Sequence, residues 1–155
     1  MTSLGSQPNA LAAAALYGQD YYRWLEATLV QLRAGAWSEV DWPDLLDELE
    51  DMGKRQKNAL KSNLRVVLMH LLKYQYQPAG RSNSWRATLR EHRLRLADEL
   101  SDSPSLKGYM STVLVECYQQ ARGLAADETG LELDQFPEPL PFRLDDILNI
   151  EFLPE

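Results

Sequence analysis

The chain has 155 residues, of which 45% are hydrophobic and 25% are charged, and its formal net charge is −7 at pH 7. This length suits one compact domain, and this balance of apolar and charged residues excludes wholesale disorder. No apolar run approaches the ~20 residues that a membrane-spanning helix needs.

The N-terminal sequence and the cysteine content indicate the cellular compartment in which we expect the protein. Cys117 is the only cysteine, so an intrachain disulfide is impossible and a reducing compartment fits. No Lys or Arg precedes Arg23, so the positive flank of a secretory signal is missing. We therefore expect a cytoplasmic protein. Residues 1–16 are expected to form a flexible, Ala-rich arm, and residues 17–155 a single helical domain.

Two helices are predicted in the first half of the chain. Residues 20–34 form the first, with Asp20 as its N-cap, an apolar stripe that includes Trp24 and Leu29, and Gly35 as a left-handed stop. The second begins near Asp41 and ends near Gln77. Its apolar residues at three- and four-residue spacing are expected to face the core: Leu45, Leu46, Leu49, Met52, Leu60, Leu64, Val67, Leu68, Leu71 and Leu72. Gly53 lies inside this helix, which either continues through it or breaks there.

Two further helices and a proline-rich end complete the prediction. One helix begins near Ser82 or Ser84 and ends at residues 101–102, and the next runs from Ser103 or Pro104 to Gly130. Residues 131–155 hold four prolines and several large apolar residues, and we expect them to pack across the helices as an ordered strap. The predicted fold is therefore all-α, an antiparallel bundle of about four main helices with a C-terminal strap.

The charge is partitioned along the chain. Residues 20–53 carry a net charge of −7, residues 54–95 of +10 and residues 96–155 of −10. Seven basic residues recur at helical spacing and could bind nucleic acid or another polyanion: Lys54, Lys57, Lys61, Arg65, Arg86, Arg90 and Arg93. The alternative is that acidic and basic helices neutralise each other within the fold. The overall acidity favours this alternative.

The two histidines are candidates for acid/base or metal chemistry. His70 lies eight residues before Pro78, and His92 lies eight residues after Ser84, so an antiparallel hairpin could bring them to one level. Glu116 and Cys117 could come close to His92. Neither histidine follows a Glu by three residues, so the usual Glu-x-x-His bundle signature is missing. The chain also lacks a phosphate loop and a nucleophile elbow, and we expect no cofactor and no metal.

Several motifs together resemble a known bacterial family. They are Asp20 to Leu25, Trp42 to Gly53, Leu68 to Pro78, Ser84 to Arg90, Phe136-Pro137, Pro141-Phe142 and Phe152 to Pro154. The chain resembles, over about residues 17–155, the family catalogued as domain of unknown function twenty-nine. The resemblance implies a compact, largely helical protein and supplies no activity.

The resemblance also marks a set of positions that a functional site could use. The matching residues are Asp20, Trp24, Glu48, Glu50, Gly53, His70, Lys73, Gln75, Trp85 and Arg86. From these we predict a buried polar network of Glu48, His70, Arg86 and His92 that fixes the order of the helices.

Three functions remain open from the sequence. The first is a non-enzymatic interaction or regulatory module that binds another protein through the N-terminal arm or the strap. The second is polyanion binding through segment 54–95. The third is a metal-dependent or acid/base enzyme that uses His70 and His92.

Overall fold

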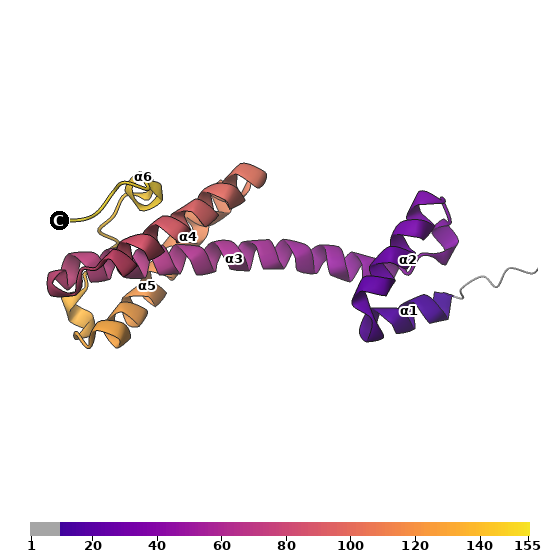
Figure 1. Ribbon diagram of the computed structural model, residues 1–155, viewed down its shortest axis with the longest axis horizontal. Coiled ribbons are helices and arrows are strands. Elements are labelled where there is room, and N and C mark those ends of the chain that lie inside the picture. The colour runs from indigo at the N-terminus through magenta and orange to yellow at the C-terminus, as the bar shows by residue number, and fades with distance from the viewer. Residues whose placement is uncertain (1–9) are drawn as a thin grey trace, which may run out of the picture. The chain divides into compact units, whose positions relative to one another are not determined.

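The described part of the chain is mostly helical. A computed structural model describes the backbone of residues 10–155 and the side chains of residues 15–155. The helices are α1 (Ala10–Gln19), α2 (Tyr21–Arg33), α3 (Trp42–Tyr76), α4 (Asn83–Asp102), α5 (Leu106–Thr129) and α6 (Leu144–Leu148) (Figure 1). Three 3-10 turns lie between them: η1 (Trp37–Glu39), η2 (Pro78–Gly80) and η3 (Leu133–Gln135). The described residues form no strand, which confirms the all-α prediction.

Local sequence signals set the ends of the four long helices. The Asp20 side chain accepts a hydrogen bond from the backbone N–H of Arg23, and the Ser82 hydroxyl accepts one from Trp85. Gly35 follows the end of α2 and Gly130 the end of α5. The φ angles of these two glycines are +68° and +72°, a left-handed conformation that glycine adopts without strain. These ends confirm the predicted ones, and α3 continues through Gly53.

The N-terminal segment differs from its prediction. Residues 10–16, expected to be part of a flexible arm, belong to α1. Alanine has the highest helix propensity, which explains a helix without an amphipathic pattern. The prediction for residues 1–9 lies outside the described residues.

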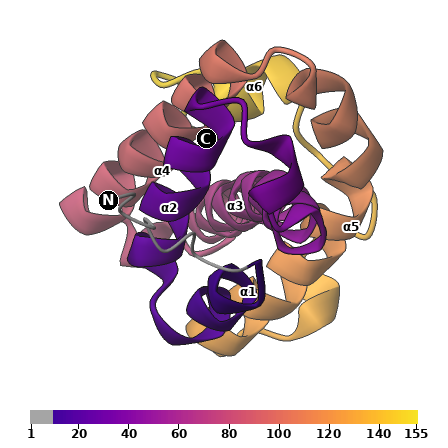
Figure 2. The ribbon, with the colours of Figure 1, turned by 90° about the vertical axis from the view of Figure 1, so that its right-hand side faces the viewer.

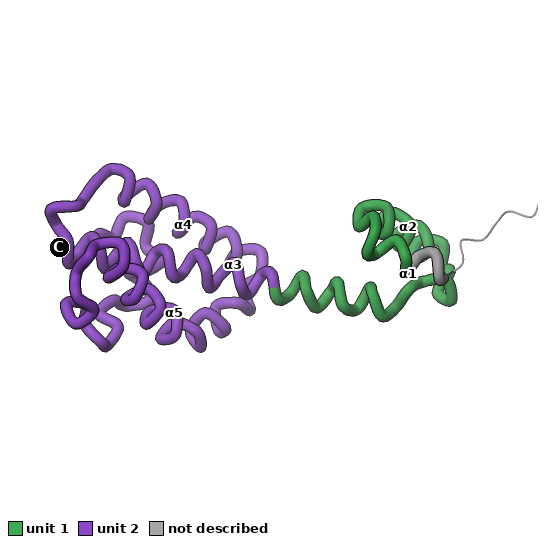
Figure 3. Tube along the Cα trace, turned by 90° about the horizontal axis from the view of Figure 1, so that it is seen from below, with its two compact units in different colours: residues 1–54 green, residues 55–155 purple. Residues whose placement is uncertain are grey.

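The described structure divides into two compact units. Unit 1 comprises residues 1–54 and unit 2 residues 55–155, so the boundary lies inside α3 (Figure 3). The predicted second helix therefore belongs to both units, and α2 belongs to unit 1.

Unit 2 is built on three helices. Lys61, Arg65 and Lys73 of α3 each contact the residue 55 positions further along the chain, in α5. This constant offset means that α3 and α5 run in the same direction. Contacts from α3 to α4 run the opposite way, with Gln56 bonded to Ser103 and Asn63 to Glu99. Figure 2 shows α3 between α4 and α5.

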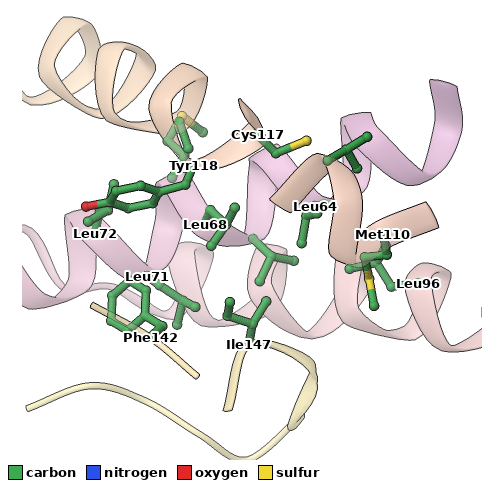
Figure 4. Close-up of a cluster of buried hydrophobic side chains, with 14 of the residues drawn as sticks. Leu64, Leu68, Leu71, Leu72, Leu96, Met110, Cys117, Tyr118, Phe142 and Ile147 are labelled. Atoms are coloured by element: carbon green, nitrogen blue, oxygen red, sulfur yellow. The ribbon is translucent and has the colours of Figure 1, made fainter. Parts of the chain in front are cut away.

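The core of unit 2 lies between these helices. Helix α3 supplies six fully buried residues, Leu60, Leu64, Val67, Leu68, Leu71 and Leu72. Leu96 of α4 and Met110, Cys117 and Tyr118 of α5 pack in the same cluster (Figure 4). Residues 131–155 contribute Phe136, Phe142 and Ile147 to this core.

Arg93 is the buried polar contact between α4 and the C-terminal segment. Its guanidinium donates to the backbone oxygens of Ile147, Phe152 and Asp146 at 2.8, 2.8 and 3.1 Å. Burial lowers the pKa of Arg93 to about 10, so the group is still a cation at neutral pH. A buried cation needs acceptors, and these three carbonyls supply them.

Candidate functional site

An apolar stripe is exposed on unit 1. It consists of Trp37, Trp42, Leu46, Leu49 and Met52, whose exposed fractions lie between 43% and 58%. The last four lie within the first three turns of α3, and Trp37 stacks on Trp42 with ring centroids 6.5 Å apart. The indole N–H of Trp42 donates to the Trp37 carbonyl at 3.0 Å, which holds the pair together.

This exposure corrects the prediction that Leu46, Leu49 and Met52 face the core. By helical register, Trp42, Leu46 and Leu49 lie on the same side of α3 as Leu60, Leu64 and Val67. In unit 2 that side is covered by α4 and α5. The connection between α4 and α5 meets α3 at Gln56, through the bond to Ser103. The stripe residues of α3 belong to unit 1, whereas Leu60, Leu64 and Val67 belong to unit 2.

The exposed apolar side chains gather in unit 1. Among the residues whose side chains are described, thirteen large apolar side chains are exposed, and nine of these belong to residues 15–54. Outside the stripe, these are Tyr21, Tyr22, Leu29 and Val30 of α2. Isolated exposed apolar residues are ordinary, but a concentration of them marks an interaction site.

An acidic hollow lies on a different side of α3 from the stripe, because Asp47 and Asp51 are well over a quarter of a turn away from Leu49 and Trp42 by helical register. Asp47, Glu50 and Asp51 line a hollow of about 430 Å³ with Tyr17 and Lys54. Lys54 lies 3.3 Å from Asp51 and 3.9 Å from Glu50, so it neutralises part of this charge. Unit 1 as a whole has nine acidic and three basic residues, a net charge of −6.

An aromatic cluster fixes α3 within unit 1. Trp24 is fully buried, and its ring centroid lies 4.6 Å from that of Tyr17 and 5.9 Å from that of Tyr21. The buried Glu48 carboxylate accepts hydrogen bonds from the hydroxyls of Tyr17 and Tyr21, at 3.1 and 2.7 Å. Burial and the adjacent Glu48 carboxylate raise the pKa of Tyr17. These contacts hold the side of α3 that faces α1 and α2.

A second hollow in unit 1 lies beside α2. Its volume is about 550 Å³, and its lining includes Ala27 and Val30 of α2 and Ala34 and Ala36 of the following loop. Gln31 also lines it, and the Oε1 atom of this buried side chain has no hydrogen-bond partner. The hollow adds concave apolar surface to the unit that carries the stripe.

The four residues of the predicted polar network have their hydrogen bonds with other partners, which corrects that prediction. Glu48 binds the two tyrosines of unit 1. His70 is buried, and its Nδ1 lies 3.0 Å from the Val66 carbonyl. Burial, assisted by nearby Lys73, lowers the pKa of His70. The exposed Arg86 guanidinium bonds Asn83 at the start of α4.

His92 belongs to a different set of hydrogen-bonded side chains, which the sequence did not indicate. Its Nδ1 lies 2.7 Å from Asn63 Oδ1, and the Asn63 amide donates to Glu99 at 3.0 Å. Burial lowers the pKa of His92 and raises that of Glu99. These bonds connect α3 to α4.

The structure shows no metal-binding arrangement in the part of the chain it describes. Residues 15–155 contain no group of three or more His, Cys, Asp or Glu side chains that could hold a metal ion. Glu116, expected near His92, binds Lys61 at 2.9 Å. Cys117 is buried, and burial raises the pKa of its thiol.

The seven predicted anion-binding residues all have partners within the fold. Three form ion pairs: Lys54 with Glu50 and Asp51, Lys61 with Glu116, and Arg90 with Glu151. The other four bind neutral groups: Lys57 lies over the Tyr109 ring, Arg65 bonds Gln120, Arg86 bonds Asn83, and Arg93 bonds three carbonyls. Three of the seven residues therefore pair with acidic side chains of the fold.

Several residues of the family motifs build the connection between α3 and α4. The buried Lys73 ammonium lies 4.5 Å from the centre of the Trp85 ring and pairs with Glu128. Gly80 lies under the same ring, where a Cβ atom would be 2.6 Å from Trp85. These positions therefore have packing roles.

In the described residues, no helix combines the length and the hydropathy that crossing a bilayer requires.

Comparison with known proteins gives the family of the chain. The family model described as Domain of unknown function DUF29 matches residues 16–153, and the chain belongs to this family. No curated protein matches the chain. No solved structure matches it either.

Proposed function

We propose that this member of the DUF29 family is a protein-interaction module, and that the apolar stripe on α3 is where another protein binds. The observation that carries this proposal is the exposure of Trp37, Trp42, Leu46, Leu49 and Met52 as one set. Tryptophan and leucine side chains of this kind supply the buried centre of protein interfaces, and tryptophan is enriched among the residues that dominate binding energy.

A surface stripe and a core differ in how much the truncation of their residues changes the free energy of unfolding. Truncating a residue that helps to hold a fold lowers the protein's free energy of unfolding, by about 2–5 kcal/mol for a buried leucine. Leu46 and Leu49 are about half exposed and belong to the part of α3 that lies in unit 1. Their role is therefore best explained by a partner.

The first test is the stability of the full chain. We expect the Leu46→Gln/Leu49→Gln variant to keep its free energy of unfolding within about 0.5 kcal/mol per site, because glutamine has a helix propensity close to that of leucine. Leu64→Ala, in the buried continuation of the same side of α3, is expected to lose about 2–5 kcal/mol. Urea unfolding monitored by circular dichroism measures both. Equal losses would show that the stripe is part of a core.

The second test is the position of the contact in cells. A photo-crosslinking amino acid is placed at Leu46 or Leu49, and at the exposed apolar control positions Leu94 and Val115 of unit 2. The proposal predicts the same discrete protein adduct from both stripe positions and its absence from both controls. Adducts that do not depend on position, or none from the stripe, would overturn it.

A further inference from the structure

A basic hollow lies in unit 2, between α4 and the C-terminal segment. Its volume is about 240 Å³. It is lined by Arg86, Leu89, Arg90 and Arg93 of α4 and by Ile150, Glu151 and Leu153. By helical register the four α4 residues lie on one side of the helix, within about 100° of one another. Three guanidinium groups and one carboxylate give this lining a net charge of +2, although the chain as a whole has a net charge of −7.

Arg93 gives the hollow a fixed positive charge. Its side chain is 1% exposed, and its guanidinium is held by the backbone carbonyls of Asp146, Ile147 and Phe152. The same three bonds hold the C-terminal segment against α4, so they also position the opposite wall of the hollow. A charge that is shielded from water is screened less than one on a solvated surface side chain. It therefore attracts an anion more strongly.

The other two arginines are open to an incoming anion. Arg90 pairs with Glu151 at 3.0 Å, but the two side chains are 55% and 79% exposed. Exposed pairs of this kind contribute little to stability, so an anion can displace the carboxylate from Arg90 at low cost. The exposed Arg86 guanidinium bonds the neutral side chain of Asn83, which leaves its charge uncompensated by that partner.

We infer that this hollow binds a small organic phosphate monoester. Such a group carries close to two negative charges at pH 7, which matches the charge of the lining, and guanidinium groups bind phosphate oxygens through paired N–H donors. The hollow has the liquid volume of about eight water molecules, more than a phosphate ion of five heavy atoms fills. Leu89, Ile150 and Leu153 supply apolar surface for the organic part of the ligand. The site belongs to unit 2 and does not depend on the function proposed for the stripe.

Calorimetric titration of the full-length chain with three probes tests this inference. The probes are phenyl phosphate, inorganic phosphate and benzoate. We expect phenyl phosphate to saturate one site and to bind about tenfold more tightly than inorganic phosphate, because its ring buries apolar surface. Benzoate has the same ring but one negative charge, and we expect it to bind about tenfold more weakly than phenyl phosphate.

Single variants locate the site. Arg86→Gln and Arg90→Gln are each expected to weaken phenyl phosphate about tenfold. Glu151→Gln is expected to strengthen it about threefold, because Arg90 loses its competing partner. The control Arg95→Gln removes a cation that lies on another side of α4 and pairs with Glu91, and it should leave the affinity unchanged. All four side chains are exposed, and circular dichroism checks that each variant is folded.

Each contrary result overturns a stated part of the inference. Absence of saturable phenyl phosphate binding would overturn the site itself. Equal affinity for inorganic phosphate would overturn the organic ligand, and equal affinity for benzoate would overturn the phosphate. Unchanged binding in folded Arg86→Gln and Arg90→Gln, or weaker binding in Glu151→Gln, would show that the phosphate binds elsewhere. Equal weakening by Arg95→Gln would show unspecific attraction to basic side chains.

Discussion

At the scale of single residues, burial decides what each charged group does. Arg86, Arg90 and Arg93 recur at helical spacing, yet only Arg93 is fully buried, where it holds backbone carbonyls of residues 146–152. Glu48 is buried against two tyrosine hydroxyls, whereas its neighbours Asp47 and Glu50 are exposed. The buried members hold the fold, whereas the exposed Glu50 pairs with the exposed Lys54.

His70 makes the stability of the fold depend on pH. Its pKa is lowered in the folded state, so on acidification below about 6.5 the unfolded chain takes up a proton that the folded chain resists. The free energy of unfolding should therefore fall with decreasing pH between the unfolded and folded pKa values, by at most about 1.4 kcal/mol per pH unit for this group.

The His70→Gln variant removes this proton uptake and keeps an amide that can donate to the Val66 carbonyl. We expect it to lose less stability than the unsubstituted chain between pH 8 and pH 5.5, as measured by urea unfolding at both values. His92→Gln serves as a comparison, because the pKa of that histidine is also lowered. An identical loss in the His70→Gln variant and the unsubstituted chain would contradict the assignment.

At the scale of helices, two glycines have opposite roles. Gly53 lies inside α3, and a Cβ atom there would meet nothing within 4 Å. Gly80 lies in η2, where a Cβ atom would come within 2.6 Å of the Trp85 ring and 3.0 Å of Gln77. The first glycine is replaceable for folding, while the second is required by the packing of the α3–α4 connection.

Substitution by alanine should therefore shift stability in opposite directions at these sites. Gly53→Ala is expected to raise the free energy of unfolding by about 0.5–1 kcal/mol, since alanine is the better helix former. Gly80→Ala is expected to lower it by about 1–3 kcal/mol, because Trp85 must move away from Lys73. Chemical denaturation of the full chain measures both. A stability loss at Gly53, or none at Gly80, would contradict this account.

The sequence predicts the long helices well because their signals are local. Asp20, Ser82, Gly35 and Gly130 mark helix ends through their own side chains or backbone conformations. The Ala-rich α1 carries no such signal, and its helix was not predicted.

The candidate site could not be predicted from the sequence in the same way. Periodicity identifies Leu46, Leu49 and Leu64 as one stripe, but it does not show that coverage ends near Gln56. The lengths of the helices carried that signal, because a 20-residue helix cannot cover a 35-residue one. The partners of His70, His92 and Arg93 depend on tertiary contacts that no local pattern encodes.

At the scale of the whole molecule, charge and apolar exposure are divided between the two units. Unit 1 has a net charge of −6 and most of the exposed large apolar side chains among the described residues, whereas unit 2 has a net charge of −1 and the large core. Under the proposed function, unit 2 is the helical scaffold and unit 1 carries the surface to which another protein binds.

The most direct test of this division is a map of where a synthetic 16-residue amphipathic helical peptide, with Leu at its apolar and Gln at its polar positions, contacts the protein. The full chain is labelled with ¹⁵N, and its amide resonances are followed by NMR as the peptide is added. The account predicts shifts concentrated in residues 37–53, with α4 and α5 unchanged, and their loss in the Leu46→Gln/Leu49→Gln variant. Shifts centred on α4 or α5, or shifts that persist in this variant, would contradict the claim that the apolar stripe is the binding surface.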